Sequence, residues 1–188
     1  MKNTVKTILS SLLVLLFFIS YAQEDVNAGS KKQRKEEKAK IKKEKEAKEA
    51  ADWITYQKLA KDQEFVVVFN KIGNNIVTKR LNFIYANGDD IILQFETNTY
   101  LSENGLGGRT INGTISNYKY KPPKNDNKPI FINFDITSKF DQQNFNISIT
   151  VYSGGITLIS MGSSVTSIHG VFSPIEDADI NLGVDMRN

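Results

Sequence analysis

Apolar positions follow two different periods along this chain, and the change between them falls near residue 62. Between Ala50 and Ala60 the apolar side chains recur at helical spacing, whereas from Phe65 onward apolar and polar residues alternate. The first period predicts a helix with one buried face, and the second predicts half-buried strands. We therefore expect a helix followed by a β domain. The apolar positions of the helix are Ala50, Trp53, Ile54, Tyr56, Leu59 and Ala60.

Segments with strand character continue to the end of the β domain, separated by Gly and Asn turns. Asn87-Gly88 is the strongest hairpin signal among these turns. The segments are evenly spaced, with short links and no helical pattern between them, which predicts an antiparallel meander. The predicted strands are 65–69, 76–86, 91–96, 110–120, 130–136, 145–151, 156–161 and 165–172.

The pattern leaves open how the sheet closes, as a two-layer sandwich or as a barrel. Gly113 lies within a predicted strand, on the same face as Ile111 and Ile115. A glycine at such a position predicts a bend or a bulge, which favours a sandwich or a partly open barrel. The predicted fold class is therefore all-β: one antiparallel meander of about eight strands, preceded by a charged N-terminal α-helix.

Residues 31–49, which precede the apolar helical face, are charged on every side. They include ten basic and five acidic side chains, no Gly or Pro, and Ile41 as the only large apolar residue. This composition favours a helix surrounded by solvent, because there is no apolar face to bury. A solvated spacer is the interpretation that we favour. The alternative is a contact with anionic lipid head groups or acidic polymers.

The N-terminus has the pattern of a signal peptide. Lys2 and Lys6 precede the apolar run 8–19, which is shorter than the roughly 20 residues of a membrane span. Small residues then predict cleavage after Ala22, with Gln23 as the first residue of the mature chain and no transmembrane span in it. The alternative is an uncleaved N-terminal anchor. Because no cysteine follows for a lipid anchor, we expect a periplasmic or secreted protein.

Cysteine usage and the distribution of charge exclude several classes of function. The chain has no cysteine, which removes disulfides, thiolate metal sites and thiol nucleophiles together. The formal net charge of +3 is misleading, since residues 31–49 carry +5 whereas residues 50–188 carry −2. A mildly acidic β domain does not indicate a nucleic-acid interface.

These patterns predict five segments. They are a signal peptide (1–22), a short linker (23–30), the Lys/Glu-rich helix (31–62, docking from about residue 50), the antiparallel β domain (63–175), and an acidic tail or edge strand (176–188).

Three strings in this layout resemble a known family. They are NFIYANGDDIILQF at Asn82–Phe95, GLGGRTINGTISN at Gly105–Asn117 and IHGVFSPI at Ile168–Ile175. With the signal ending and the charged helix before them, they resemble a family of exported bacterial proteins named for domain of unknown function 4251. The resemblance covers about residues 31–183. It implies an exported β domain, and it implies no activity, catalytic residue or cofactor.

Catalytic residue types are sparse in the β domain. His169 is the only histidine, and it lies in a predicted strand between Ile168 and Gly170. A lone histidine of this kind, without a carboxylate or nucleophile identifiable nearby, is more often structural than a general base. The acidic residues Asp89, Asp90, Glu176, Asp177, Asp179 and Asp185 lack the spacing of a calcium loop, so we expect turn and tail roles for them.

A glycine-rich turn is the best local candidate for a ligand contact. No helix follows it and no Lys-Ser/Thr pair follows the glycines, so a phosphate loop is not indicated. The glycines are more typical of a sharp turn, with a backbone ligand site and a nearby cation as the alternative. Trp53 is expected to be a packing anchor, with ligand contact as its alternative. The candidate contact residues are Gly105, Gly107, Gly108, Arg109 and Trp53.

Three hypotheses of function follow. The first is a non-catalytic binding or interaction module of the cell envelope, with an envelope protein, lipid or polymer as its partner. The second is a carrier of a small apolar molecule inside a closed barrel. The third is a hydrolase of envelope polymers that uses carboxylates such as Asp90, Glu96 and Asp135. We expect no enzyme activity, no metal and no cofactor.

Overall fold

A computed structural model describes residues 33–96, 108–125, 128–162 and 166–183. The chain divides into two compact units, residues 1–48 and residues 49–188. A helix spans residues 33–62 and is followed by β-strands and short 3₁₀ turns. The elements are β1 (Glu64–Ile72), β2 (Asn75–Ile76), η1 (Lys79–Leu81), β3 (Phe83–Asn87), β4 (Asp90–Glu96), β5 (Gly108–Lys121), β6 (Ile130–Ser138), β7 (Asn144–Val151), η2 (Ser153–Gly155), β8 (Ile156–Met161), β9 (Ile168–Ser173) and η3 (Ile175–Asp177).

In the first unit, residues 33–48 are helical and every one of them is exposed. Lys40 and Glu44 lie 4.0 Å apart and Lys42 and Glu46 lie 3.7 Å apart, each pair one turn along the helix. Exposed pairs of this kind contribute a few tenths of a kcal/mol each. Residues 33–48 therefore gain helical stability from their own helix propensity and from charge pairs along the helix.

The second unit is an eight-stranded antiparallel barrel. Its strands pair in the order β1-β3-β4-β5-β6-β7-β8-β9, and a pairing of β1 with β9 closes the circle. The short strand β2 folds back on the end of β1. Apart from β2, strands adjacent in sequence pair directly, as the meander prediction requires. The sequence pattern left a sandwich and a barrel open, and the pairing of β1 with β9 shows that the sheet forms a barrel.

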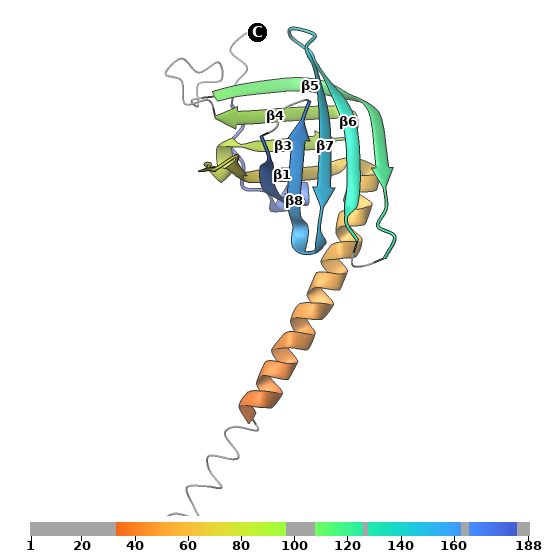
Figure 1. The fold of residues 1–188 in the computed structure, drawn as a ribbon, viewed down its shortest axis with the longest axis vertical. Helices are drawn as coiled ribbons and strands as arrows, with labels where there is room; N and C mark the ends of the chain where they lie inside the picture. Colours follow the sequence, from red (N-terminus) through yellow and green to blue (C-terminus); the bar gives the residue numbers. More distant parts are fainter. Residues whose placement is uncertain (1–32, 97–107, 126–127, 163–165, 184–188) are drawn as a thin grey trace, which may run out of the picture. The chain divides into compact units, whose positions relative to one another are not determined.

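The barrel turns its corner in β5, the longest strand. Residues Gly108–Thr114 pair with β4, and the ladder with β6 begins at Gly113. In Figure 1, β3 and β4 run across the direction of β6 and β7, and β5 bends from one direction to the other. A Cβ on Gly113 would lie 2.6 Å from Ile136 Cγ2 and 2.8 Å from the Thr137 carbonyl oxygen. The bend predicted at Gly113 therefore depends on the missing side chain.

Apolar side chains fill the interior of the barrel. Alternate residues of every long strand point inward and form one cluster with the end of the helix. Trp53 and Ala60 belong to this cluster, and the Tyr118 hydroxyl donates to the Ala60 carbonyl oxygen. The docked helical face is narrower than predicted, since Ala50 and Ile54 are exposed. The largest fully buried side chains include Phe65, Phe69, Phe134, Phe172, Leu93 and Ile111.

The predicted strand 76–86 is interrupted in the structure. β2 ends at Ile76, η1 follows, and β3 begins only at Phe83. The buried Asn82 side chain accounts for the break, because it donates to the Thr78 carbonyl oxygen and to Glu96 Oε2 and accepts from the Glu96 N–H, each at 2.8 Å. The last strand also differs from its prediction, with bounds of Ile168–Ser173 rather than 165–172.

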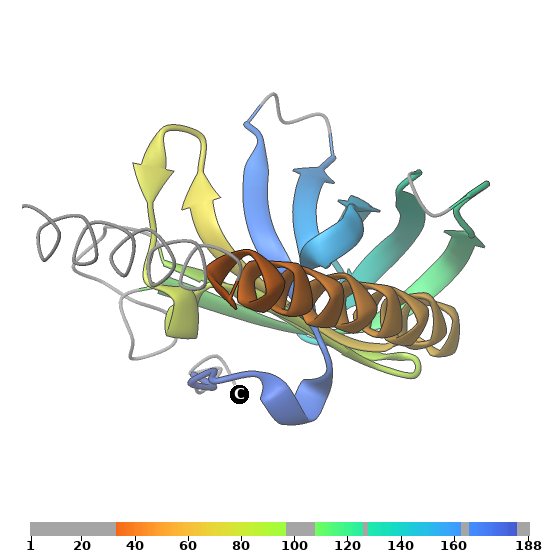
Figure 2. The same cartoon turned by 90° about the horizontal axis from the view of Figure 1, so that it is seen from below.

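Residues 174–183, the described part of the segment after β9, lie on the outside of the barrel (Figure 2) and form no strand. Figure 2 shows the segment leaving η3 and running outside the sheet. Asn181 N donates to the Arg80 carbonyl oxygen at 2.8 Å. The prediction for this segment was an acidic tail or an edge strand, and its described residues form a tail along the surface of the barrel.

Candidate functional site

A groove of about 380 Å³ lies on the outer surface, where the barrel closes. β1 and β9 form its floor, and η1 and the segment after η3 form its walls. Ligand pockets typically measure ~300–1,000 Å³, so this groove is large enough for a small molecule or a short polymer segment. Its lining residues are Val68, Asn70, Lys79, Arg80, Val171, Ser173, Asp177, Ala178 and Asp179.

The floor of the groove is apolar because of the register between β1 and β9. Val68 and Val171 are paired across the two strands and both point away from the interior. Val171 is 41% exposed. Paired valines on an outer face offer a ligand a flat apolar surface.

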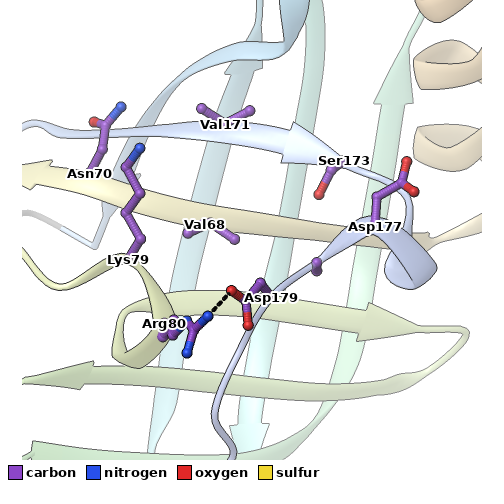
Figure 3. A pocket seen from close by; sticks show the side chains of 9 residues that line it. Val68, Asn70, Lys79, Arg80, Val171, Ser173, Asp177 and Asp179 are labelled. Atoms are coloured by element: carbon purple, nitrogen blue, oxygen red, sulfur yellow. Dashed lines mark hydrogen bonds and ion pairs between the residues drawn. The ribbon is translucent and has the colours of Figure 1, made fainter.

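Opposite charges lie at the two ends of this floor. Figure 3 shows Asn70 and Lys79 at one end and Ser173 and Asp177 at the other, with the two valines between them. Within the described ranges, no salt bridge joins Lys79 or Asp177 to another side chain. A cation at one end and an anion at the other complement a ligand that carries both a carboxylate and an amine.

The field of Asp177 reaches the docked end of the helix. Burial raises the pKa of the Tyr56 hydroxyl, and the negative charges of Asp52 and Asp177 raise it further. The Tyr56 ring packs edge-on against Phe172, with 5.7 Å between ring centroids. The negative charge of Asp177 therefore lies close enough to Tyr56 to affect its hydroxyl group, which places this end of the groove near the docked end of the helix.

The wall after η3 is held by polar contacts. Arg80 forms an ion pair and hydrogen bond with Asp179, drawn as a dashed line in Figure 3. Farther along, Gln94 Nε2 donates to the Asn181 carbonyl oxygen at 2.9 Å, and Gln94 Oε1 accepts from Gly183 N at 2.7 Å. The position of this wall depends on Gln94, which lies on the outer face of β4.

A second groove, of about 320 Å³, lies over the β3–β4 hairpin and its neighbours. Its charged residues, Asp90 and Lys139, are paired with each other at 2.6 Å. Tyr85, Ile92 and Asn112 also line it. Because its two charges are paired with each other, this groove is less suited to bind a charged ligand than the first.

The three carboxylates considered for hydrolysis have separate surroundings. Asp90 pairs with Lys139, and Glu96 accepts from Asn82 and from Thr78 N. Asp135 accepts from Asn146 and Asn117, and these hydrogen bonds lower the pKa of its carboxyl group. A carboxylate stabilised in its ionised form is unsuited to act as a general acid.

The candidate contacts predicted around the glycine-rich turn are only partly described. Gly105 and Gly107 lie outside the described residues. Gly108 begins β5, where a Cβ would lie 2.1 Å from the Phe95 carbonyl oxygen, so this glycine permits close strand pairing. Arg109 pairs with Asp141 at 2.8 Å and also donates to Gln143 Oε1 at 3.3 Å. The surroundings of both residues support structural roles.

Trp53 and His169 lie apart from the charged groove. Trp53 is 4% exposed and belongs to the interior cluster, so its surroundings support packing. His169 points outward on β9, with Leu158 and Lys71 as its register partners. Within the described ranges, no group of three or more His, Asp or Glu side chains is arranged to hold a metal ion. Among the described residues, no helix combines the length and the apolar character needed to cross a membrane.

The sequence pattern missed the groove because its residues come from distant segments. Asn70, Lys79 and Val171 carry no motif, and only the pairing of the first and last strands brings them together. Asp177 and Asp179 were singled out as members of an acidic tail. The structure places both in the groove, although Asp179 is paired with Arg80. Asp185 lies outside the described residues.

Comparison with known proteins gives a match among solved structures. No family model matches the chain, and no curated protein matches it. Among solved structures, the chain is similar to the crystal structure of a DUF4251 family protein from Bacteroides eggerthii DSM 20697, with 26% sequence identity and a TM-score of 0.52. The match covers 70% of this chain and 95% of that chain. This similarity confirms the resemblance that the three sequence strings indicate.

Proposed function

Taking the chain as a DUF4251-like protein, we propose that it is an exported, non-catalytic binding module of the cell envelope. Its ligand is a peptide-bearing fragment of the cell wall, bound in the outer groove between β1–β9 and η1. The predicted signal peptide supplies the argument for export. The argument for the ligand comes from Lys79 and Asp177, which form no salt bridge within the part of the chain that the structure describes. The name of the similar DUF4251 protein assigns it no activity.

The observation that carries this proposal is the order of chemical groups along the groove. Lys79 with Asn70, the Val68–Val171 floor, and Ser173 with Asp177 follow one another across the same surface. A short peptide with a free carboxylate, a small apolar side chain and a free amine presents the complementary order. Cell-wall stem peptides have this chemistry, and an exported protein would meet them at high local concentration.

Binding rather than catalysis is favoured by the state of the carboxylates. Asp179 is neutralised by Arg80, and the remaining acidic group of the groove, Asp177, lies opposite a lysine rather than a second carboxylate. Polymer hydrolysis by paired carboxylates requires two such groups on either side of the bond, ~5–10 Å apart. The carrier hypothesis gains no support either, because large apolar side chains occupy the interior cluster.

The direct test is an NMR titration of the mature chain, Gln23–Asn188, with cell-wall fragments released by a muramidase. We expect saturable shifts at Val68, Asn70, Val171 and Ser173. Lys79→Ala should weaken binding roughly tenfold, the effect of one charge-assisted hydrogen bond. Asp177→Asn should do the same for fragments with a free amine and should not alter binding of fragments whose amine is acetylated.

The matched control is Lys139→Ala, which removes the cation of the second groove and should leave the affinity unchanged. Lys79 and Lys139 are both surface lysines on the barrel, so the pair separates a local contact from a general effect of charge. Equal affinity of the Lys79→Ala variant and the unsubstituted chain would refute the proposal. Shifts confined to the second groove would refute it as well.

A further inference from the structure

One row of side chains on the outer face of β3, β4 and β5 is buried although it includes polar residues. Asn82 and Gln94 are 0% exposed and Thr110 is 2% exposed. Phe83 shares the outer row with Gln94, since the two are register partners, and it is also 0% exposed. Outer-face side chains of a barrel normally contact water, so this row is covered from outside. We call the row Phe83, Gln94 and Thr110 the β3–β4 track.

Gln94 satisfies its whole amide at this place. Its Nε2 donates to the carbonyl oxygens of Leu81 and Asn181, at 3.2 and 2.9 Å. Its Oε1 accepts from Thr110 Oγ1 at 2.9 Å and from Gly183 N at 2.7 Å. Two of these four bonds go to the main chain of the segment after η3. Asn181 and Gly183 are two residues apart, the spacing at which an extended chain presents groups on one side.

The barrel binds the covering segment mainly through the backbone of the segment rather than through its side chains. Asn181 uses its N–H for Arg80 and its carbonyl for Gln94, while its side chain is exposed. Leu182 is 58% exposed. Among the hydrogen bonds and ion pairs of residues 178–183 with the rest of the described chain, only the Arg80–Asp179 pair uses a side chain of the segment, and that pair is itself exposed. Any extended polypeptide with a free carbonyl and a free N–H two residues on would fit the same amide.

The segment is held by little apolar burial. Asp179, Asn181 and Leu182 are exposed, and the residues between them are only partly buried. Its attachment therefore rests on a few hydrogen bonds, each worth about 0.5–1.5 kcal/mol net, and on one exposed ion pair. Segments attached in this way open locally without unfolding of the core.

We propose that the β3–β4 track is a docking site for an extended segment of a partner polypeptide, and that residues 178–183 occupy it in the resting chain. The partner donates and accepts the main-chain hydrogen bonds now made by Gly183 and Asn181. Recognition by added extended chain is a common mode for β proteins. Here the resident segment keeps a buried amide satisfied until the partner arrives.

Docking on the track is coupled to the groove, whatever the groove binds. Ala178 and Asp179 belong to the displaced segment and also line the groove. A partner that displaces residues 178–183 removes one wall, so partner and groove ligand bind antagonistically. Thermodynamic linkage makes this effect reciprocal.

The test uses the mature chain and a capped peptide with the sequence of residues 174–183. Tethering gives the resident segment an effective concentration in the millimolar range, so we expect half-displacement at millimolar peptide. The readouts are the NMR signals of the Gly183 amide and of the Gln94 side-chain amide. A peptide with Asn181→Ala should displace the segment equally well. A peptide with Gly183→Pro lacks the N–H that Gln94 accepts and should fail, and because only the peptides differ, protein folding is unaffected.

A reversible lock supplies the second arm. Arg80 and Asn181 are hydrogen-bonded main-chain neighbours with exposed side chains, and the chain has no other cysteine, so Arg80→Cys with Asn181→Cys gives one defined disulfide. We expect the oxidised variant to exclude the peptide and the reduced variant to accept it. Equal uptake by both forms would overturn the proposal, as would displacement by the Gly183→Pro peptide. Dimers formed through exchanged C-terminal segments, with no displacement by the Asn181→Ala peptide, would assign the track to a second copy and also overturn it.

Discussion

Two neighbouring residues of β4, one on each face of the strand, are both buried, by opposite chemistry. Leu93 points into the barrel and is 1% exposed within an apolar cluster. Gln94, the next residue, points outward and is 0% exposed under the segment that includes Asn181 and Gly183. The inner face is buried by the barrel itself, whereas the outer face is buried by a segment some ninety residues away in sequence. Burial inside is therefore intrinsic to the fold, and burial outside is conditional on one attachment.

The difference has an energetic consequence. Apolar burial contributes about 25 cal/mol per Å² and needs no partner of fixed geometry. A buried amide contributes little net stability, and it costs roughly 1–3 kcal/mol when a partner is removed. The inner face should thus determine global stability, and the outer face should determine whether residues 178–183 stay attached.

The largest effect is expected inside. Leu93→Ala should lower the free energy of unfolding by about 2–5 kcal/mol, because it leaves a cavity in the packed interior. Urea unfolding followed by circular dichroism measures the loss. The control is Ile92→Ala on the outer face, where the side chain is only partly buried. A loss at Leu93 no larger than the loss at Ile92 would show that the interior is not the main source of stability.

A smaller effect is expected at the neighbouring outer position. Gln94→Leu keeps the volume but leaves Asn181, Gly183 and Thr110 without their partner, and should cost roughly 1–3 kcal/mol. Hydrogen exchange of the Gly183 amide should become fast while the β6 and β7 amides keep their protection. Asn181→Ala, which removes only an exposed side chain, serves as the control. Slow exchange at Gly183 in the Gln94→Leu variant would contradict the conditional attachment.

The helix-covered part of the core adds a pH dependence. Burial raises the pKa of the Tyr118 hydroxyl above its ordinary 10.0, with a smaller contribution from Tyr120. The unfolded chain therefore loses this proton first, so stability is complete below pH 10 and falls as pH rises above it. Tyr118→Phe should cost about 0.5–1.5 kcal/mol at neutral pH and flatten the decline above pH 10. An unchanged slope in this variant would exclude Tyr118 as its source.

The smallest effect is expected at the exposed end of the attachment. Asp179→Ala removes the ion pair with Arg80 and should change global stability by less than about 1 kcal/mol. It should still speed hydrogen exchange at Asn181, whose N–H bonds to the Arg80 carbonyl oxygen. Added salt should produce the same change in the unsubstituted chain, because it screens exposed charges. Salt-independent exchange at Asn181 would show that the ion pair does not hold the segment.

The sequence by itself determined which face of most strands is buried. Side-chain alternation in 91–96, 130–136 and 145–151 predicted the inner residues of β4, β6 and β7, because a strand with one buried face has an apolar residue at every second position. The same reasoning predicted the bend at Gly113 and the packing of Trp53. It missed the break at Asn82, where a buried amide replaces strand pairing with side-chain hydrogen bonds.

Only the tertiary structure decided how the barrel closes and where its surface is able to bind. Alternation specifies the faces of a strand and not the partners of its edges, so the pairing of Val68 with Val171 has no local signal. The groove depends on that pairing, because Lys79 and Asp177 lie at the two ends of the same surface only when β1 pairs with β9. The role of Gln94 has no local signal either, because a polar residue within a strand is normally predicted to face solvent. Only the tertiary structure shows that a distant segment covers Gln94 and satisfies its amide.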